Sequence, residues 1–171
     1  SKDVPEINLG NEILEKVLNR ELPLKIHAHR ADDIQTAMRI AAEFDIEYTL
    51  DHCTEGYLML DILKEAKVPV ILGPVMISRP KVELKNLNYG AAAEFEKAGV
   101  EFAISTDHPE VPIQLLSCSA AYCVREGLSE QAALRAITIN PARFCGLSDR
   151  IGSIEPGKDA DIVLFENHPL D

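Results

Sequence analysis

The chain has 171 residues, enough for one hydrophobic core but short of the about 250 residues that a complete eight-stranded α/β barrel typically needs. Hydrophobic residues make up 46% of it and charged residues 26%, and no apolar run approaches the about 18 residues that cross a bilayer. The 28 acidic residues exceed the 17 basic ones, giving a net charge of -11, and the basic residues are scattered along the chain. This composition is typical of a globular protein and disfavours both a membrane and nucleic acid as partners.

The cysteines and the first residues bear on the cellular compartment. No pair of the four cysteines has C-x-x-C spacing, and Cys118 and Cys123 lie five residues apart within one helical pattern, a poor geometry for a disulfide. Residues 1–5 lack the basic and apolar regions of a signal peptide. We therefore expect reduced thiols and a cytoplasmic location.

Short β-type runs alternate with helical patterns through the first part of the chain. After a helix at 11–20, strands are expected at 24–28, 47–51, 68–73 and 100–105, with helices between them at 33–44, 55–66 and 89–98. Asp32 or Asp33 is expected to cap the start of the helix at 33–44. The alternation predicts an α/β fold with a parallel sheet and helical crossovers. A polar loop with a proline, at 78–88, is expected to carry substrate contacts.

The chain changes character after the fourth predicted strand. Helices are expected at 112–126 and 130–138, the second capped by Ser129, and a further short helix ends at Gly146. A Pro-Gly turn then precedes a strand predicted at 160–165, outside the alternating series. We therefore divide the chain into residues 1–150, which hold the sheet, and residues 151–171, which hold this last strand.

Three segments place metal-competent side chains just after a predicted strand and just before a helical pattern. They are Ile26-His27-Ala28-His29, Asp51-His52-Cys53 and Ser105-Thr106-Asp107-His108. Because the carboxyl ends of parallel strands meet at one edge of a sheet, we expect these side chains to gather there. Barrel enzymes keep their chemistry at this edge.

Two further motifs follow these segments. They are Thr138-Ile139-Asn140-Pro141-Ala142 and Gly152-Ser153-Ile154-Glu155-Pro156-Gly157-Lys158-Asp159-Ala160-Asp161. Together with the order His, His, Asp at the strand ends, they resemble the second half of an amidohydrolase-superfamily enzyme, and the second motif is most similar to the imidazolonepropionase-related branch. The resemblance implies a partial TIM (β/α)₈ barrel, with strands five to eight and their crossover helices in 1–150. It implies that residues 151–171 begin the returning β-segment of a small sandwich domain.

The activity that the resemblance implies is hydrolysis of a C–N bond in a small amide or cyclic amide by metal-activated water. The implied cofactor is Zn²⁺, or another divalent metal such as Mn²⁺ or Fe²⁺, and the implied ligands are His27, His52 and Asp107. Asp107 would also act as general base, and His52 would bind a second metal or hold the hydrolytic water. The residues expected to contact substrate are His29, His108 and Arg79.

The strand series allows two other interpretations. If His27 and His29 were the metal-binding pair of a barrel's first strand, seven strands should follow, and only three sheet strands do. We therefore assign this strand as the fifth. A flavodoxin-like doubly wound domain would use the same series, but the chain has no Gly-rich phosphate loop after its first strand. The order of the strands in space distinguishes these folds.

Alternatives also remain for the function. The parent protein is expected to act on a small molecule, but a deaminase or deacetylase of the same superfamily would use the same residues. A separate alternative is that the isolated chain, which lacks a first-strand His-x-His pair, is an inactive folding or association module. Four strands leave a barrel open, so we expect the chain to self-associate or to bind the missing N-terminal half.

Overall fold

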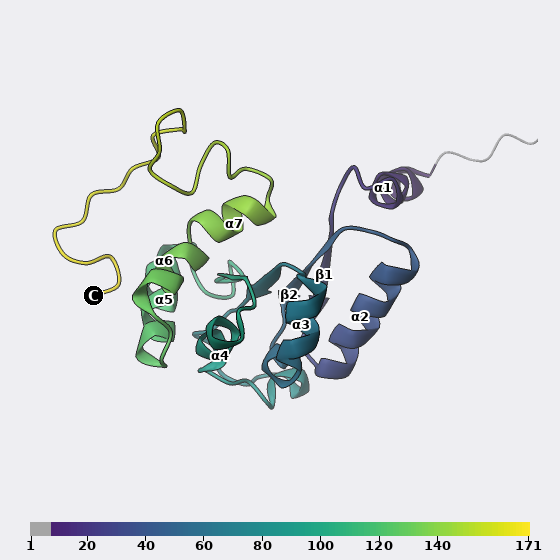
Figure 1. The fold of residues 1–171 in the computed structure, drawn as a ribbon. Helices are drawn as coiled ribbons and strands as arrows, with labels where there is room; N and C mark the ends of the chain where they lie inside the picture. The colour runs from purple at the N-terminus through teal and green to yellow at the C-terminus, as the bar shows by residue number, and fades with distance from the viewer. Residues whose placement is uncertain (1–7) are drawn as a thin grey trace, which may run out of the picture.

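A four-stranded parallel sheet organises the chain in the computed structural model, which describes residues 8–171 (Figure 1). Residues 1–5, on which the expectation about a signal peptide rests, lie outside the described residues. The strands are β1 (Leu24–Ala28), β2 (Tyr48–His52), β3 (Val70–Leu72) and β4 (Phe102–Ile104). They lie side by side in the order β1-β2-β3-β4, all parallel. A flavodoxin-like sheet would place its first strand between the second and third, so this order excludes it.

Helices follow each strand, as predicted from the alternation of patterns. They are α1 (Leu9–Leu18), α2 (Ala31–Glu43), α3 (Leu60–Ala66), α4 (Ala91–Ala98), α5 (Leu116–Arg125), α6 (Glu130–Ala136) and α7 (Ile139–Phe144), with short 3₁₀ turns η1 (Gly56–Met59), η2 (Val82–Leu84) and η3 (Ile113–Leu115). Figure 1 shows α2, α3 and α4 along one side of the sheet, with α1 standing apart from them. None of the described helices combines the length and the apolar character needed to cross a bilayer.

The hydrophobic core lies between the sheet and these helices. Register pairs join Ile26, Leu50, Val70 and Phe102 into one row across the four strands. The last three side chains of this row are buried, and Ile34 of α2, Leu63 of α3 and Phe95 of α4 pack against the same core with no exposed surface. Apolar residues at helical spacing in α2 thus meet the alternating apolar residues of the strands, as the sequence pattern predicted.

The opposite face of the sheet is more polar. Its row runs from His27 through Asp51 and Ile71 to Ala103. His27 is exposed, and Asp51 and Ile71 are half-buried. Asp51 accepts a hydrogen bond from Thr49 Oγ1 (3.1 Å) and pairs with Lys25 (3.4 Å). The helices therefore cover one face of the sheet, while the other stays open at β1.

Of the two predicted helix caps, the one of α6 is confirmed and the one of α2 is wrong. Ser129 Oγ accepts from the backbone N–H of Ala132 (3.1 Å) and caps α6, as expected. Neither Asp32 nor Asp33 caps α2, because this helix begins two residues earlier, at Ala31, so both aspartates already lie in its first turn. There they still stabilise the positive end of the helix dipole. The donor at Ala31 is satisfied by Glu55, from a distant part of the chain (2.8 Å).

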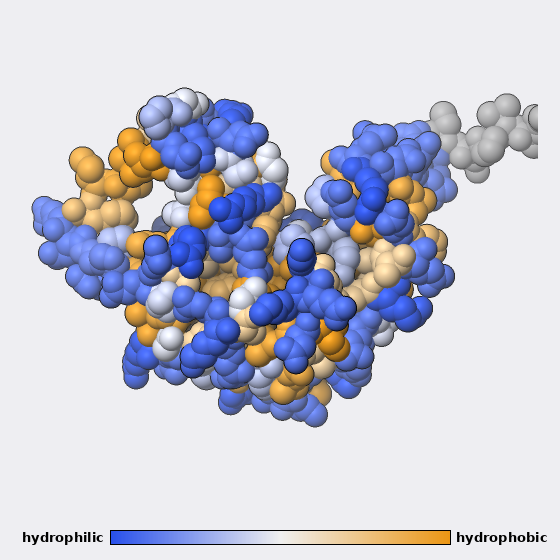
Figure 2. Space-filling view, in the orientation of Figure 1, coloured by the Kyte–Doolittle hydropathy of each residue, from blue (hydrophilic) through white to orange (hydrophobic). Residues whose placement is uncertain are grey.

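The strand predicted at 160–165 does not form. This segment is irregular, and no strand of the described residues pairs with it. A strand needs a neighbouring strand to accept and donate its backbone hydrogen bonds, and this apolar run lacks one. Its side chains from Ile162 to Phe165 are at least 56% exposed, and Figure 2 shows hydrophobic surface along this tail. That residues 151–171 join a β-sandwich stays a prediction.

Gly73, at the end of β3, is a position where the fold admits no side chain. Its φ of +144° lies outside the range that side-chain-bearing residues favour, and a Cβ there would stand 2.0 Å from the carbonyl oxygen of Ser105. The neighbouring strands are closely joined at this point, since Ser105 N–H donates to Leu72 O (2.8 Å). A side chain at residue 73 would therefore push β3 and β4 apart.

We predict that Gly73→Ala lowers the free energy of unfolding by more than about 4 kcal/mol, because backbone overlap adds to conformational strain. Gly127→Ala is the matched control: Gly127 also has a positive φ (+107°), but its Cβ would make an ordinary 3.7 Å contact with Ala93. This control should lose only about 1 to 3 kcal/mol from strain. Urea denaturation of both variants measures the difference, and equal losses would contradict the close approach at Gly73.

Candidate metal centre

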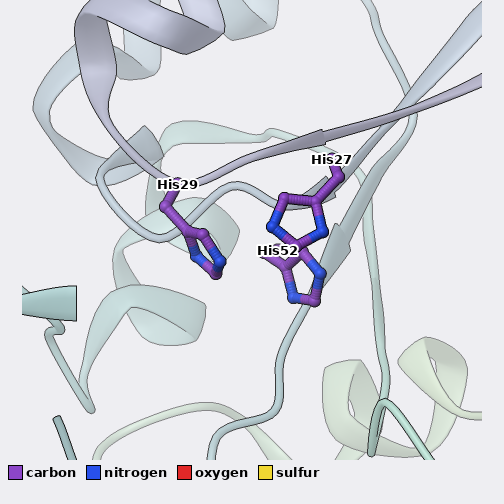
Figure 3. Close-up of side chains that lie close together, drawn as sticks. All are labelled: His27, His29 and His52. Atoms are coloured by element: carbon purple, nitrogen blue, oxygen red, sulfur yellow. The ribbon is translucent and has the colours of Figure 1, made fainter. Parts of the chain in front are cut away.

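Three histidines meet at the carboxyl ends of β1 and β2. His27 belongs to β1, His29 follows the last residue of that strand, and His52 ends β2. Figure 3 shows their imidazole rings close together. One ligand nitrogen from each lies within 4.8 Å of the others. The ring centroids of His27 and His52 are 4.2 Å apart, and that of His29 lies 4.6 Å from His52 and 4.8 Å from His27.

The backbone at the end of β2 turns His52 into this group. In the strand register His52 is paired with Ala28 and Leu72, whose side chains are in the core under the helices. Its φ of +72°, followed by +45° at Cys53, is uncommon for residues with a side chain and breaks the strand's alternation. Strain of this kind costs about 1–3 kcal/mol and is concentrated at functional sites.

A hydrogen bond fixes the orientation of His52. Its Nδ1 lies 2.6 Å from the carbonyl oxygen of Gly73. A carbonyl oxygen only accepts, so Nδ1 carries the proton and Nε2 keeps its lone pair. This is the arrangement typical of a metal-binding histidine, in which one ring nitrogen is held by a carbonyl and the other is left for the ion.

His29 has a buried nitrogen with no partner. Its Nδ1 lies 2.7 Å from Thr54 Oγ1, while its Nε2 is buried and forms no hydrogen bond with any residue of the described chain. A buried polar atom without a partner is costly, so such atoms are normally satisfied by protein, water or a ligand. Nε2 of His29 is therefore suited to an ion or to a polar atom of a substrate that enters the pocket.

Desolvation favours the neutral form of His27 and His29. Desolvation is the main cause that lowers the pKa of His29 to about 4, and the charges of His52 and His27 act in the same direction. Partial desolvation, followed by His52, also lowers the pKa of His27. Neutral imidazole is the form that binds a metal, so little proton competition opposes binding at neutral pH. Three nitrogen donors of this kind suit Zn²⁺ and related divalent ions and leave further positions open.

Asp107 lies near the histidines but is not part of the group that they form. It follows β4 with a φ of +53°, is exposed, and lines one pocket together with His29 and His52. Its charge raises the pKa of His27, against the effect of desolvation. Asp107 is therefore placed to act at the site, and its predicted roles as ligand and base stay predictions.

The loop between β3 and α4 lines much of the pocket. This loop contributes Ile77, Lys81, Leu84, Leu87, Asn88 and Tyr89 to its lining. The lining is thus largely apolar, and it includes His29, His52 and a few other polar side chains. Small-molecule sites have this character.

Arg79 and His108, which were predicted to contact substrate, do not line the pocket. Arg79 donates to Leu87 O (2.7 Å) and lies 5.7 Å from the Tyr89 ring centroid, so it holds its own loop together. His108 accepts from Ile113 N–H (3.3 Å) and does not line the pocket. Lys81, which sequence reasoning missed, does line it, and its charge lowers the pKa of His27 and His29. Only its place in the predicted substrate loop could have pointed to it.

Comparison with known proteins agrees with this geometry. The "Amidohydrolase family" description matches residues 9–171, almost the whole chain. The chain belongs to the amidohydrolase family. Its structure is similar to that of an amidohydrolase from Thermotoga maritima MSB8, with a TM-score of 0.95 and 46% identity over 99% of this chain and 44% of that one.

Two curated proteins are similar to this chain in sequence. Imidazolonepropionase from Maricaulis maris is 31% identical over 85% of this chain and 36% of its own length. Adenine deaminase from Ligilactobacillus salivarius is 48% identical, but over only 30% of this chain and 9% of its own length. The chain thus spans about a third of the imidazolonepropionase that it matches. The resemblance to the imidazolonepropionase-like branch, predicted from the closing motifs, is confirmed.

The unusual pKa of His29 gives a direct test of the site. In the metal-free protein His29 should titrate near pH 4, and NMR of its ring signals measures this. The unfolded chain protonates this residue near its ordinary 6.5, so the folded state binds fewer protons between about 6.5 and about 4. The free energy of unfolding should therefore fall as the pH is lowered through this range, and His29→Gln should remove that part of the slope. A ring that titrates at 6.5 or above would contradict the burial of His29.

Proposed function

We propose that this chain is the C-terminal part of a metal-dependent amidohydrolase that hydrolyses a C–N bond of a small amide or cyclic amide. The observation that carries the proposal is the group of His27, His29 and His52, whose nitrogens converge, and two of which, His29 and His52, line a largely apolar pocket. Membership of the family and the largely apolar lining of the pocket support a small-molecule substrate.

The chain's residues would take the following roles. His27 and His52 would hold Zn²⁺, with Mn²⁺ or Fe²⁺ as alternatives, and Asp107 would complete the set of ligands. A divalent ion bound there lowers the pKa of water to about 7 and polarises the substrate's carbonyl group. Asp107 would accept the proton of the attacking water and pass it to the leaving nitrogen. His29 Nε2 would serve either as a further ligand or as a contact to the substrate.

Among C–N bonds, we propose those of cyclic amides. The similarity to imidazolonepropionase, which extends over 85% of this chain, supports this class. Deamination is the second candidate, supported by the short stretch that is 48% identical to adenine deaminase. The two reactions differ in their products, because deamination releases ammonia and ring opening of a cyclic amide does not.

The sheet would correspond to strands five to eight of a (β/α)₈ barrel in residues 1–150. Its sequential order, its coverage of 44% of the T. maritima chain and its open face at β1 support this placement. The remaining strands would cover the face that carries His27 and Asp51. The chain's partner would then be the other half of its own barrel, or a second copy where that half is missing.

The proposed roles predict the behaviour of variants in the complete protein. His27→Ala should lose bound metal, measured by elemental analysis, and His29→Ala decides between the two roles of that residue, because loss of metal would make it a ligand.

Asp107→Asn should lower kcat by about 10²- to 10⁴-fold, since proton transfer is removed. Turnover of cyclic amides and of adenine, followed by ring opening and by ammonia release, identifies the reaction. Near-normal kcat in Asp107→Asn would exclude Asp107 from the mechanism.

The open fold predicts association of the isolated 171-residue chain. Apolar side chains of α1, among them Leu9, Ile13 and Leu18, are more than half exposed, and so are those of 162–165. Surfaces of this kind associate in water. Sedimentation at low concentration should show self-association, or a complex when the N-terminal half is added, and amidase activity should be negligible for the isolated chain even with Zn²⁺. A stable, active monomer would contradict the half-barrel.

A further inference from the structure

We propose that Glu55 is a positioning residue that ties the loop over the pocket, residues 77–89, to the strand end that carries His29. Glu55 lies three residues after His52 and is 6% exposed. Its side chain is not one of the histidine group and does not line the pocket, and none of the roles proposed above uses it. Among the described residues it forms no ion pair, so its buried carboxylate depends on hydrogen-bond donors alone.

One set of contacts joins Glu55 to the His29 segment. Its backbone N–H donates to His29 O (2.8 Å), and its Oε2 accepts from Ala31 N–H (2.8 Å). The residue before it, Thr54, lies 2.7 Å from His29 Nδ1 through its hydroxyl. The segment at 54–55 therefore fixes both the backbone and the ring of His29.

A second set of contacts joins Glu55 to the loop. Its Oε1 accepts from Asn86 Nδ2 (2.7 Å), and Asn86 O accepts from the Tyr57 hydroxyl (3.0 Å). Asn86 stands between Leu84 and Leu87, two apolar residues of the pocket lining. A movement of this carboxylate would therefore shift the loop and the start of α2 together.

Capping of α2 does not by itself explain this arrangement. A helix cap requires one acceptor, and Oε2 supplies it. The second oxygen is directed to a loop that lies 31 positions further along the chain. The two oxygens of one rigid group thus link the support of the metal centre with the wall of the pocket, which makes loop position dependent on Glu55.

Reversal of the hydrogen bond to the loop tests this link. In Asn86→Asp two carboxylates face each other, so the contact to the loop is lost while the contact to Ala31 remains. In the double variant Glu55→Gln with Asn86→Asp, the new amide donates to the new carboxylate, and the amide oxygen still accepts from Ala31. Lys85→Gln is the matched control, because it makes the same change of charge at a neighbouring side chain that has no hydrogen-bond or ion-pair partner among the described residues.

Hydrogen exchange in the complete protein reports on the loop without reference to any activity. The amides of Leu84, Lys85 and Leu87 are bonded within the loop, to Lys81 O, Val82 O and Leu84 O. In Asn86→Asp their exchange should accelerate by about 10-fold, because the loop opens more often. Exchange should return to that of the parent protein in the double variant and be unchanged in Lys85→Gln. Unchanged exchange in Asn86→Asp, or no recovery in the double variant, would overturn the proposal.

Kinetics provide a second readout, which rests on the proposed function. With a substrate that is turned over, Asn86→Asp should raise KM by roughly 5- to 10-fold with kcat and metal content unchanged, since the loop binds substrate and the histidines are untouched. The double variant should recover the parent KM. A lower kcat or a loss of metal would overturn the assignment of Glu55 to loop positioning. If no substrate is found, the proposed function fails, and the exchange experiment still decides the role of Glu55.

Discussion

The hydrogen bond between His52 Nδ1 and the carbonyl oxygen of Gly73 is the contact on which the arrangement of the site depends. It determines which nitrogen of His52 faces the other histidines, and it connects the end of β2 to the end of β3. The same glycine packs directly against Ser105 O, in the segment that leads from β4 to Asp107. Three of the four strand ends are therefore held in one arrangement through a residue without a side chain. This hydrogen bond offsets the cost of the strained backbone at His52, because the strained conformation brings Nδ1 to the carbonyl oxygen.

Electrostatics at the histidine group differ from those of the chain as a whole. A net charge of -11 would favour protonated histidines if long-range attraction were decisive. Screening by salt weakens charges that lie more than about 10 Å away, whereas desolvation and neighbouring cations act directly. Burial, the other imidazoles and Lys81 all lower the pKa of His29, and they outweigh the acidic surface. The local environment therefore prepares these side chains to bind a cation even though the chain is strongly acidic.

Sequence reasoning predicted those features that depend on local pattern. The strand at 24–28 was placed correctly, and the one expected at 47–51 is observed one residue later, at Tyr48–His52. Both are amphipathic or apolar runs bounded by clear breaks. The cap of α2 and the role of Glu55 could not be predicted, because the two partners are 24 positions apart and only the packed fold brings them together. The strand expected at 160–165 was wrong because its apolar pattern signals a strand only where a neighbouring strand exists to pair with it.

The three histidines differ in burial because they lie at different places on the sheet. His29 and His52 line a pocket together with the loop at 77–89 and are 7% and 8% exposed, whereas His27 lies on the open face and is exposed. A metal ligand with one side open to water would bind its ion loosely, because water competes with it and its ring is free to turn. Strands laid over the face of His27 and Asp51 would remove that competition and lower the local dielectric constant around all three rings. In the barrel that we propose, the remaining strands would thus complete the metal centre as well as the hydrophobic core, so folding of the barrel and tight metal binding would be coupled.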